Sequence, residues 1–150
     1  MPHPKHILVV SCLVRNRENA ILCVKHKNRG WEMPQGRVEE GEALIDALHR
    51  EVHEETGMTI ADPRLAVIWS KLSEPAALIH GFVAAVGGGD LTPSDETPEV
   101  AWLSEPAARE RITHPVNRDR LHDLLAAEGR DGGAVRFYSY TKRPYRRIDP

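Results

Sequence analysis

The sequence predicts an α+β fold, an α/β/α sandwich in which a mixed β-sheet lies between helices. Short apolar, β-branched runs with the length of buried strands alternate with a few segments of helical periodicity. Several of these runs are separated by polar turns short enough for hairpins. Because no repeat, low-complexity tract or long linker divides the chain, residues 1–150 are expected to form one domain with a real core.

The expected strands begin near the N-terminus. Residues 6–14 (HILVVSCLV) and 20–24 flank a polar turn and predict a hairpin. A polar loop then leads to a short extended piece over residues 31–36, which Pro34 and Gly36 bring into a tight turn. Further strands are expected over residues 58–69, with a turn at Asp62-Pro63, and over 76–86, 96–103 and 134–140, with a flexible turn at 87–90.

The clearest helix is expected over residues 42–56. Leu44, Leu48 and Val52 recur every four residues and form one apolar stripe. Gly57 directly follows the last helical residue, where glycine commonly ends a helix.

Two more helices are expected near the C-terminus. Ser104 and Pro106 start a helix that runs to about residue 112. A second helix covers residues 116–128 and ends at Gly129. The basic residues 141–150 are expected to be a flexible tail.

The composition narrows the class of protein. A hydrophobic share of 41% and a charged share of 28% are ordinary for a globular domain. The net charge of -2 implies no bulk attraction to nucleic acid or membrane. The apolar run near the start is too short to span a membrane, so a cytoplasmic protein is expected. Cys12 and Cys23 lie in apolar runs and are expected to be buried, reduced thiols.

Three carboxylates are concentrated on the helix predicted over residues 42–56. Glu51, Glu54 and Glu55 stand at i, i+3 and i+4 and share one helix face, where like charges repel. A charge run is usually a solvated face. Here, however, Glu51 and Glu55 fall within about 20° of Leu44 on a helical wheel, beside the apolar stripe. This position favours a cation between the carboxylates, and Mg²⁺ prefers such oxygen ligands.

From Gly36 to Met58 the chain reads GRVEEGEALIDALHREVHEETGM. It meets every defined position of the pattern Gx5Ex7REUxEExGU, where U is apolar, and therefore resembles the Nudix box. The likeness to the Nudix family extends over about residues 6–127 as a fold. It implies a Nudix-like mixed sheet with a loop-helix-loop motif, and a hydrolase of phosphoanhydride bonds that uses Mg²⁺, with Mn²⁺ as a substitute.

The resemblance also implies roles for residues of the box. Glu51, Glu54 and Glu55 would be catalytic and bind the metal, and the carbonyl of Gly36 would join them. One glutamate, or a water that it holds, would act as the base, and the sequence does not select which. Glu42 and Arg50 would pair and fix the loop against the helix.

A fourth metal-binding carboxylate is expected from a later segment, as in many family members. Glu96 and Glu99 precede Trp102 and are the two candidates, of which Glu99 is preferred. An exposed loop glutamate without a metal role is the alternative for either position.

Four residues before the helix are expected to contact substrate: Trp31, Lys25, Arg29 and Gln35. The resemblance places Trp31 and Gln35 on the nucleoside side, although a core position for Trp31 is the favoured alternative. The basic loop with Lys25 and Arg29 could hold phosphates or be solvated.

The predicted substrate is a nucleoside diphosphate linked to another moiety: a nucleoside triphosphate, a dinucleoside polyphosphate or a nucleotide sugar. Ser73 and Glu74 stand where relatives acting on ADP-ribose carry a proline, which disfavours that substrate. Nucleic acid is not an expected partner, although an RNA 5′ end stays open, and a homodimer is compatible with the sequence. The alternative function is a non-catalytic Nudix-fold module that binds nucleotides or regulates a partner.

Overall fold

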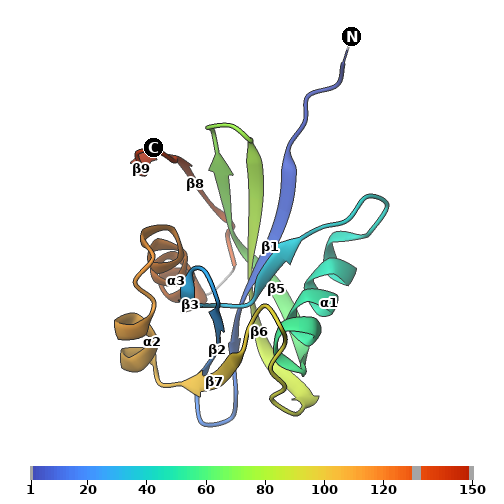
Figure 1. The fold of residues 1–150 in the computed structure, drawn as a ribbon, viewed down its shortest axis with the longest axis vertical. Coiled ribbons are helices and arrows are strands. Elements are labelled where there is room, and N and C mark those ends of the chain that lie inside the picture. The colour runs from blue at the N-terminus through green and yellow to red at the C-terminus, as the bar shows by residue number, and fades with distance from the viewer. Residues whose placement is uncertain (1, 130–132, 149–150) are drawn as a thin grey trace.

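The computed structural model describes residues 2–129 and 133–148 (Figure 1). Three helices are present in these residues: α1 (Leu44–Thr56), α2 (Glu105–Arg111) and α3 (Pro115–Glu128). They are combined with strands β1 (Ile7–Arg15), β2 (Ile21–His26), β3 (Gly30–Glu32), β4 (Gln35–Arg37), β5 (Met58–Lys71), β6 (Ala77–Gly89), β7 (Glu99–Leu103), β8 (Arg136–Thr141) and β9 (Arg146–Ile148).

The strands form one mixed sheet. Its central order is β3-β2-β1-β6-β5-β8-β9, with β4 paired to β1 and β7 paired to β2. The pairs β1–β6 and β5–β8 are parallel, whereas the remaining pairs are antiparallel. α1 lies on one side of the sheet, and α2 and α3 lie on the other (Figure 1). The predicted α/β/α sandwich is therefore confirmed.

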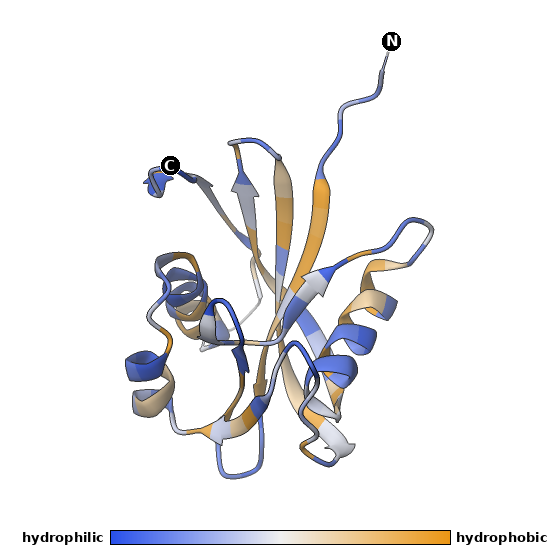
Figure 2. Ribbon diagram, viewed as in Figure 1, coloured by the Kyte–Doolittle hydropathy of each residue, from blue (hydrophilic) through white to orange (hydrophobic). Residues whose placement is uncertain are grey.

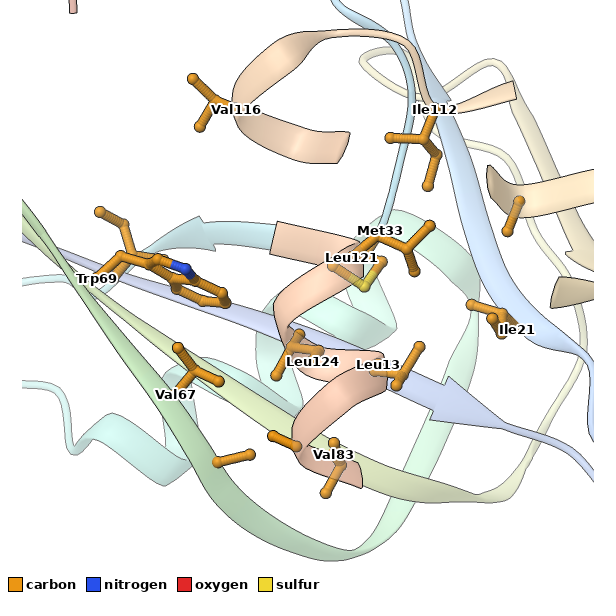
Figure 3. Packing of buried hydrophobic residues seen from close by; sticks show 14 of the residues in the cluster. Leu13, Ile21, Met33, Val67, Trp69, Val83, Ile112, Val116, Leu121 and Leu124 are labelled. Carbon is orange, nitrogen blue, oxygen red and sulfur yellow. The ribbon is translucent and has the colours of Figure 1, made fainter. Parts of the chain in front are cut away.

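Alternating side chains of β1 divide the core into two layers. Cys12 and Val14 pack toward Leu48 and Val52 of α1, in one buried cluster. Leu13 points to the opposite face, in the cluster that contains α3 residues. Figure 2 shows apolar residues concentrated on the central strands, and Figure 3 shows Leu121 and Leu124 of α3 beside Val67 and Trp69 of β5. The two layers attach α1 and α3 to opposite faces of the sheet.

Two predicted turns are parts of long strands. β5 is one strand with register shifts on both sides of Asp62, whose φ of 52° marks a local irregularity rather than a chain reversal. The glycine run at residues 87–89 belongs to β6, where Gly88 and Gly89 pair with Thr59 and Met58. Non-local pairing between β5 and β6 thus outweighs the local turn signals of proline and glycine.

The C-terminal segment is folded over residues 141–148, contrary to the predicted flexible tail. β9 pairs with β8, and the Arg147 guanidinium donates to both oxygens of Asp123 at 2.7 and 2.8 Å. Arg147 also lies 4.2 Å from the ring centroid of Tyr138. These contacts fix residues 141–148 against the rest of the fold, which the basic composition alone did not indicate. Residues 149 and 150 of the predicted tail lie outside the described part of the chain.

Two local predictions, the buried thiols and the start of α2, agree with the structure. Cys12 and Cys23 are buried and free, and Ser104 caps α2 by accepting from the Ala107 amide. Within residues 2–129 and 133–148, no helix combines the length and apolar character needed to cross a membrane.

Candidate active site

α1 carries the carboxylates of the site on a helix that is fixed along its length. Ala47, Leu48 and Val52 are buried against the sheet. The helix ends at Gly57, whose left-handed φ of 76° lets its amide donate to the His53 carbonyl at 2.8 Å. Because the glutamates lie beside this buried stripe, their positions follow from the packing of the helix.

Glu51 lies directly against Gly36. A methyl group added to Gly36 would overlap the Glu51 carboxylate, so the close approach requires glycine. The Glu51 side chain is only 16% exposed. Burial raises the pKa of Glu51, and a hydrogen bond from Arg50 opposes that rise.

Glu55 is the most buried of the three carboxylates, with 7% of the residue exposed. One of its oxygens accepts from the backbone amide of Gln35 at 2.9 Å. Burial raises the pKa of Glu55 to about 8, and the nearby charges of Glu32 and Glu51 add to that rise. A buried glutamate with this pKa needs a positive charge nearby to stay ionised at neutral pH.

Arg50 connects the loop before α1 with the glutamates on it. Its guanidinium donates to both oxygens of Glu42 at 2.7 and 2.8 Å, so the predicted pair is present. It also donates to Glu51 at 2.9 Å, to Glu54 at 3.3 Å and to the carbonyl of Arg37 at 3.1 Å. The hydrogen bond from Arg50 lowers the pKa of Glu42 to about 2. One cation therefore fixes the loop and partly neutralises the acidic face.

The three glutamates line a cavity of about 330 Å³, named here the acidic cavity. The opposite wall is the segment before β7, and the lining is Glu51, Glu54, Glu55, Ser94, Asp95 and Glu96. The segment is anchored to α1, because the Thr97 hydroxyl donates to the Glu55 carbonyl at 2.9 Å. Asp95 was not predicted as part of the site, although it stands next to Glu96 in an acidic SDE run.

The preference for Glu99 over Glu96 does not agree with this geometry. Glu99 pairs with Lys25 at 3.2 Å, and its side chain is 58% exposed. The two residues are Cα partners in the pairing of β2 with β7, a non-local register that the sequence does not reveal. Glu96 instead borders the acidic cavity, where its carbonyl accepts from the Lys27 amide at 3.2 Å.

The donor set of the acidic cavity fits a divalent cation. Five carboxylates, those of Glu51, Glu54, Glu55, Asp95 and Glu96, supply only hard oxygen ligands, which suit Mg²⁺ and Mn²⁺. In their present rotamers, no three Asp, Glu, His or Cys side chains of residues 2–129 and 133–148 converge on one point. Glu54 is 58% exposed, and its hydrogen bond to Arg50 is long, at 3.3 Å, so its side chain has room to turn toward a cation.

A second cavity, of about 270 Å³, lies between β4, α3 and the turn after β8, and is named here the basic cavity. It is lined by Val9, Arg29, Gln35, Gly36, Arg37, His114, Val116, Asn117, Arg120 and Lys142. Gln35 links the two cavities. Its backbone amide donates to the Glu55 carboxylate, and its side-chain oxygen accepts from Arg120 at 2.6 Å.

Of the four residues predicted to contact the substrate, two line the basic cavity. Arg29 and Gln35 line it, whereas Lys25 pairs with Glu99. Trp31 packs against the core cluster with the Arg111 guanidinium 5.7 Å from its ring centroid, as the core alternative predicted. The other polar lining residues were not predicted; they are Arg37, which follows Gly36, and His114, Asn117, Arg120 and Lys142 from distant segments.

The fold places a cavity lined with carboxylates next to a cavity lined with cations, and Gln35 connects the two. A family model described as the NUDIX domain matches residues 5–125. The chain therefore belongs to the Nudix hydrolase family.

Relatives and solved structures agree with this membership. The 8-oxo-(d)GTP phosphatase of Mycolicibacterium smegmatis is 32% identical over 107 residues, which is 69% of this chain and 33% of that protein. A MutT-like protein of Streptomyces ambofaciens is 30% identical over 132 residues, covering 84% of this chain and 81% of the relative. The chain thus spans about a third of the first relative's length. The MutT protein structure from Bacillus halodurans shares the fold, with a TM-score of 0.74, 22% identity and 95% of each chain covered.

Proposed function

We propose that this chain is a pyrophosphohydrolase that depends on a divalent cation and cleaves the diphosphate linkage of a nucleoside triphosphate or related nucleotide. The observation that carries the proposal is the acidic cavity, where Glu55 is buried, Glu51 is partly buried and Glu54 is exposed. Buried carboxylates that share one cavity are costly unless a cation lies between them.

The residues proposed to hold the cation are Glu51, Glu54 and Glu55, with Glu96 from the opposite wall and the carbonyl of Gly36 beside them. Glu96 replaces the Glu99 preferred from the sequence. A divalent cation held there would neutralise charge on phosphate oxygens and make a water molecule a stronger nucleophile. The glutamates would also accept the proton that this water loses.

The other residues of the site position these groups. Arg50 fixes Glu42 and Glu51, so that the loop and helix keep one arrangement. The backbone amide of Gln35 fixes Glu55. Arg29 and Gln35 face the substrate from the basic cavity, on the other side of Gly36. The substrate would therefore extend from the acidic cavity past Gly36 to the basic cavity.

A purine nucleoside triphosphate is the first substrate to test, since the Mycolicibacterium smegmatis relative carries the name 8-oxo-(d)GTP phosphatase. The experiment measures phosphate and pyrophosphate release from a panel of nucleoside triphosphates, 8-oxo-dGTP, dinucleoside polyphosphates and nucleotide sugars, with Mg²⁺ or Mn²⁺. Wild-type protein should hydrolyse at least one compound.

Two variants make the experiment decisive. Glu54→Gln keeps the size of the side chain and should lower kcat by about 100-fold or more, because it removes a charged metal ligand. Glu40→Gln, an exposed residue of the neighbouring loop, removes the same charge and should leave kcat unchanged. Activity that survives Glu54→Gln would overturn the mechanism, and metal binding without any hydrolysis would support a non-catalytic module.

A further inference from the structure

We propose that the basic cavity binds a phosphate group that the substrate carries in addition to its scissile diphosphate. This inference rests on the proposed function, because it concerns the substrate of the same site. It identifies the substrate class as nucleotides with an extra phosphate on the part that lies beyond Gly36.

The charges around the cavity are unbalanced. Four lining residues are cations, namely Arg29, Arg37, Arg120 and Lys142, and no lining residue is acidic. Within the described residues, Glu32 is the carboxylate that forms an ion pair with this group; it is fully buried behind Arg29 and accepts from it at 2.8 and 2.9 Å. Glu55 and Glu96 add weaker electrostatic effects on the same arginine. Glu32 can match one of the four positive charges, so an excess of positive charge faces the cavity.

Arg120 is the cation that points most clearly to a ligand. The residue is only 8% exposed, and the groups that accept hydrogen bonds from its guanidinium are neutral: Gln35 Oε1 at 2.6 Å and the Tyr140 hydroxyl at 3.1 Å. Its buried Nε has no hydrogen-bond partner among the described residues. A buried guanidinium without a counter-ion is costly, and a phosphate oxygen would supply the missing acceptor.

The N-terminus of α3 adds to the positive potential. Val116 and Asn117 of the first turn line the cavity, and this turn contains no acidic residue. No side chain caps the helix, and the buried Nδ1 of His114 lacks a partner within residues 2–129 and 133–148. Helix N-termini favour anions because their amide groups are unpaired.

The cations around the basic cavity lower the pKa values of two residues that line it, His114 and Lys142. Burial lowers the pKa of His114, and the nearby Lys142 lowers it further. Burial likewise lowers the pKa of Lys142, with Lys71 and Arg120 adding to the effect. These shifts agree with a cluster of cations that lacks its anion.

A neutral nucleobase is a poorer occupant. Base recognition commonly uses an aromatic ring for stacking, and no aromatic side chain lines the described cavity. Apolar contact comes only from Val9 and Val116. A phosphate uses the cations that a neutral ring would leave unpaired.

The first experiment measures binding of inorganic phosphate by calorimetry in the presence of EDTA. Without divalent cations the acidic cavity repels phosphate, so saturable binding reports on the basic cavity. Lys142→Gln and Arg37→Gln, both at exposed positions, should each weaken the affinity about tenfold. Arg118→Gln removes a charge from the exposed face of α3 outside the cavity and should change nothing. Absent binding, or equal binding by all four proteins, would overturn the proposal.

The second experiment compares a nucleoside 5′-triphosphate that the protein hydrolyses with the same compound bearing a 3′-phosphate. The 3′-phosphorylated compound should have a KM about tenfold lower, and Lys142→Gln should abolish the difference. Equal KM values would overturn the proposal. So would a stronger preference for a 5′-triphosphorylated dinucleotide, whose extra phosphate is a diester, because that result identifies an RNA end.

The two experiments separate this proposal from the proposed function. If no nucleotide is hydrolysed, the proposed function fails, and the phosphate titration in EDTA still decides whether the basic cavity is an anion site. If hydrolysis occurs without preference for the extra phosphate, only the present proposal fails.

Discussion

At the scale of single residues, contact between Gly36 and Glu51 is the tightest constraint on the site. The Glu51 carboxylate occupies the space that any larger residue at position 36 would need. The Nudix pattern specifies glycine there, and the structure gives the steric reason. Replacing this residue should therefore disturb the carboxylates before it disturbs the fold.

Gly36→Ala should lower the affinity for Mg²⁺ or Mn²⁺ by about 10- to 100-fold, because the added methyl group displaces a metal ligand. Titration calorimetry measures the affinity, and thermal unfolding checks that the protein is folded. Gly129→Ala is the matched control, since an added methyl group meets nothing within 4 Å there. Unchanged metal affinity in Gly36→Ala would contradict the assigned geometry.

The raised pKa of Glu55 implies that the stability of the folded protein depends on pH. Its pKa in the folded protein is about 8, above the ordinary 4.5, so the folded state binds this proton more tightly than the unfolded chain. The resulting stability is fully present below pH 4.5 and is lost as pH rises toward about 8. In EDTA, the free energy of unfolding should therefore fall by a few kcal/mol between about pH 5 and 8.

Urea unfolding of wild-type protein and Glu55→Gln at several pH values measures this effect. The variant should lack most of the decline, and the difference between the two proteins isolates Glu55 from Glu51, whose pKa is also raised, and from His114, whose lowered pKa acts in the opposite direction. Saturating Mg²⁺ should remove most of the decline in the wild type. Parallel curves for the two proteins would contradict the assignment of Glu55.

At the scale of elements, the site depends on two segments that are anchored to α1. Arg50 holds the preceding loop through Glu42 and the Arg37 carbonyl. Thr97, which is fully buried, holds the later segment through the Glu55 carbonyl. The helix is thus the common support for both walls of the acidic cavity.

Arg50→Lys should lower kcat about tenfold, because lysine cannot reproduce the forked contacts with Glu42 and the Arg37 carbonyl. Amide hydrogen exchange in residues 38–43 should accelerate at the same time. Arg109→Lys, in an exposed pair with Glu105, is the control and should alter neither measurement. Loss of activity without faster exchange would show that Arg50 acts otherwise than by fixing the loop.

The segment before β7 yields a prediction that separates two glutamates. Glu96→Gln should weaken metal binding about tenfold, because Glu96 borders the acidic cavity. Glu99→Gln should have no effect, since Glu99 pairs with Lys25. Manganese titrations followed by electron paramagnetic resonance measure both affinities. The reverse order of effects would favour the sequence-based choice of Glu99.

The sequence predicted those features that depend on neighbours along the chain. The spacing of Leu44, Leu48 and Val52 predicted α1 to within two residues of its start, and Ser104 predicted the start of α2. Two features that depend on strand pairing were not predicted: the place of Gly88 in β6, and the position of Glu99 beside Lys25. The basic cavity was missed for the same reason, since Arg37, Asn117 and Lys142 meet only after folding.

At the scale of the whole molecule, the C-terminal strands β8 and β9 extend the sheet beside β5, and Tyr140 of β8 joins the buried cluster that contains α3 residues. Arg147 neutralises Asp123, which is buried and also accepts from the Trp69 indole at 2.8 Å. Tyr140 of β8 is buried and contacts Arg120. The basic cavity and the global fold therefore depend on the same C-terminal segment.

Arg147→Met should destabilise the protein by about 3 kcal/mol, because Asp123 remains as a buried charge without its cation. The double variant Arg147→Met/Asp123→Asn should recover part of this loss. Chemical denaturation monitored by tryptophan fluorescence and circular dichroism measures both. A loss below about 0.5 kcal/mol would agree with a loosely attached tail and contradict the account.

The central claim is that the acidic cavity is the metal-dependent catalytic centre. The most direct measurement is the nucleotide hydrolysis rate as a function of Mg²⁺ concentration, in wild-type protein and in Glu51→Gln. The wild type should be inactive in EDTA and reach saturation as Mg²⁺ is added, whereas Glu51→Gln should need at least tenfold more Mg²⁺ and reach a lower maximal rate. Undiminished hydrolysis in EDTA, or the same Mg²⁺ curve for both proteins, would contradict the claim.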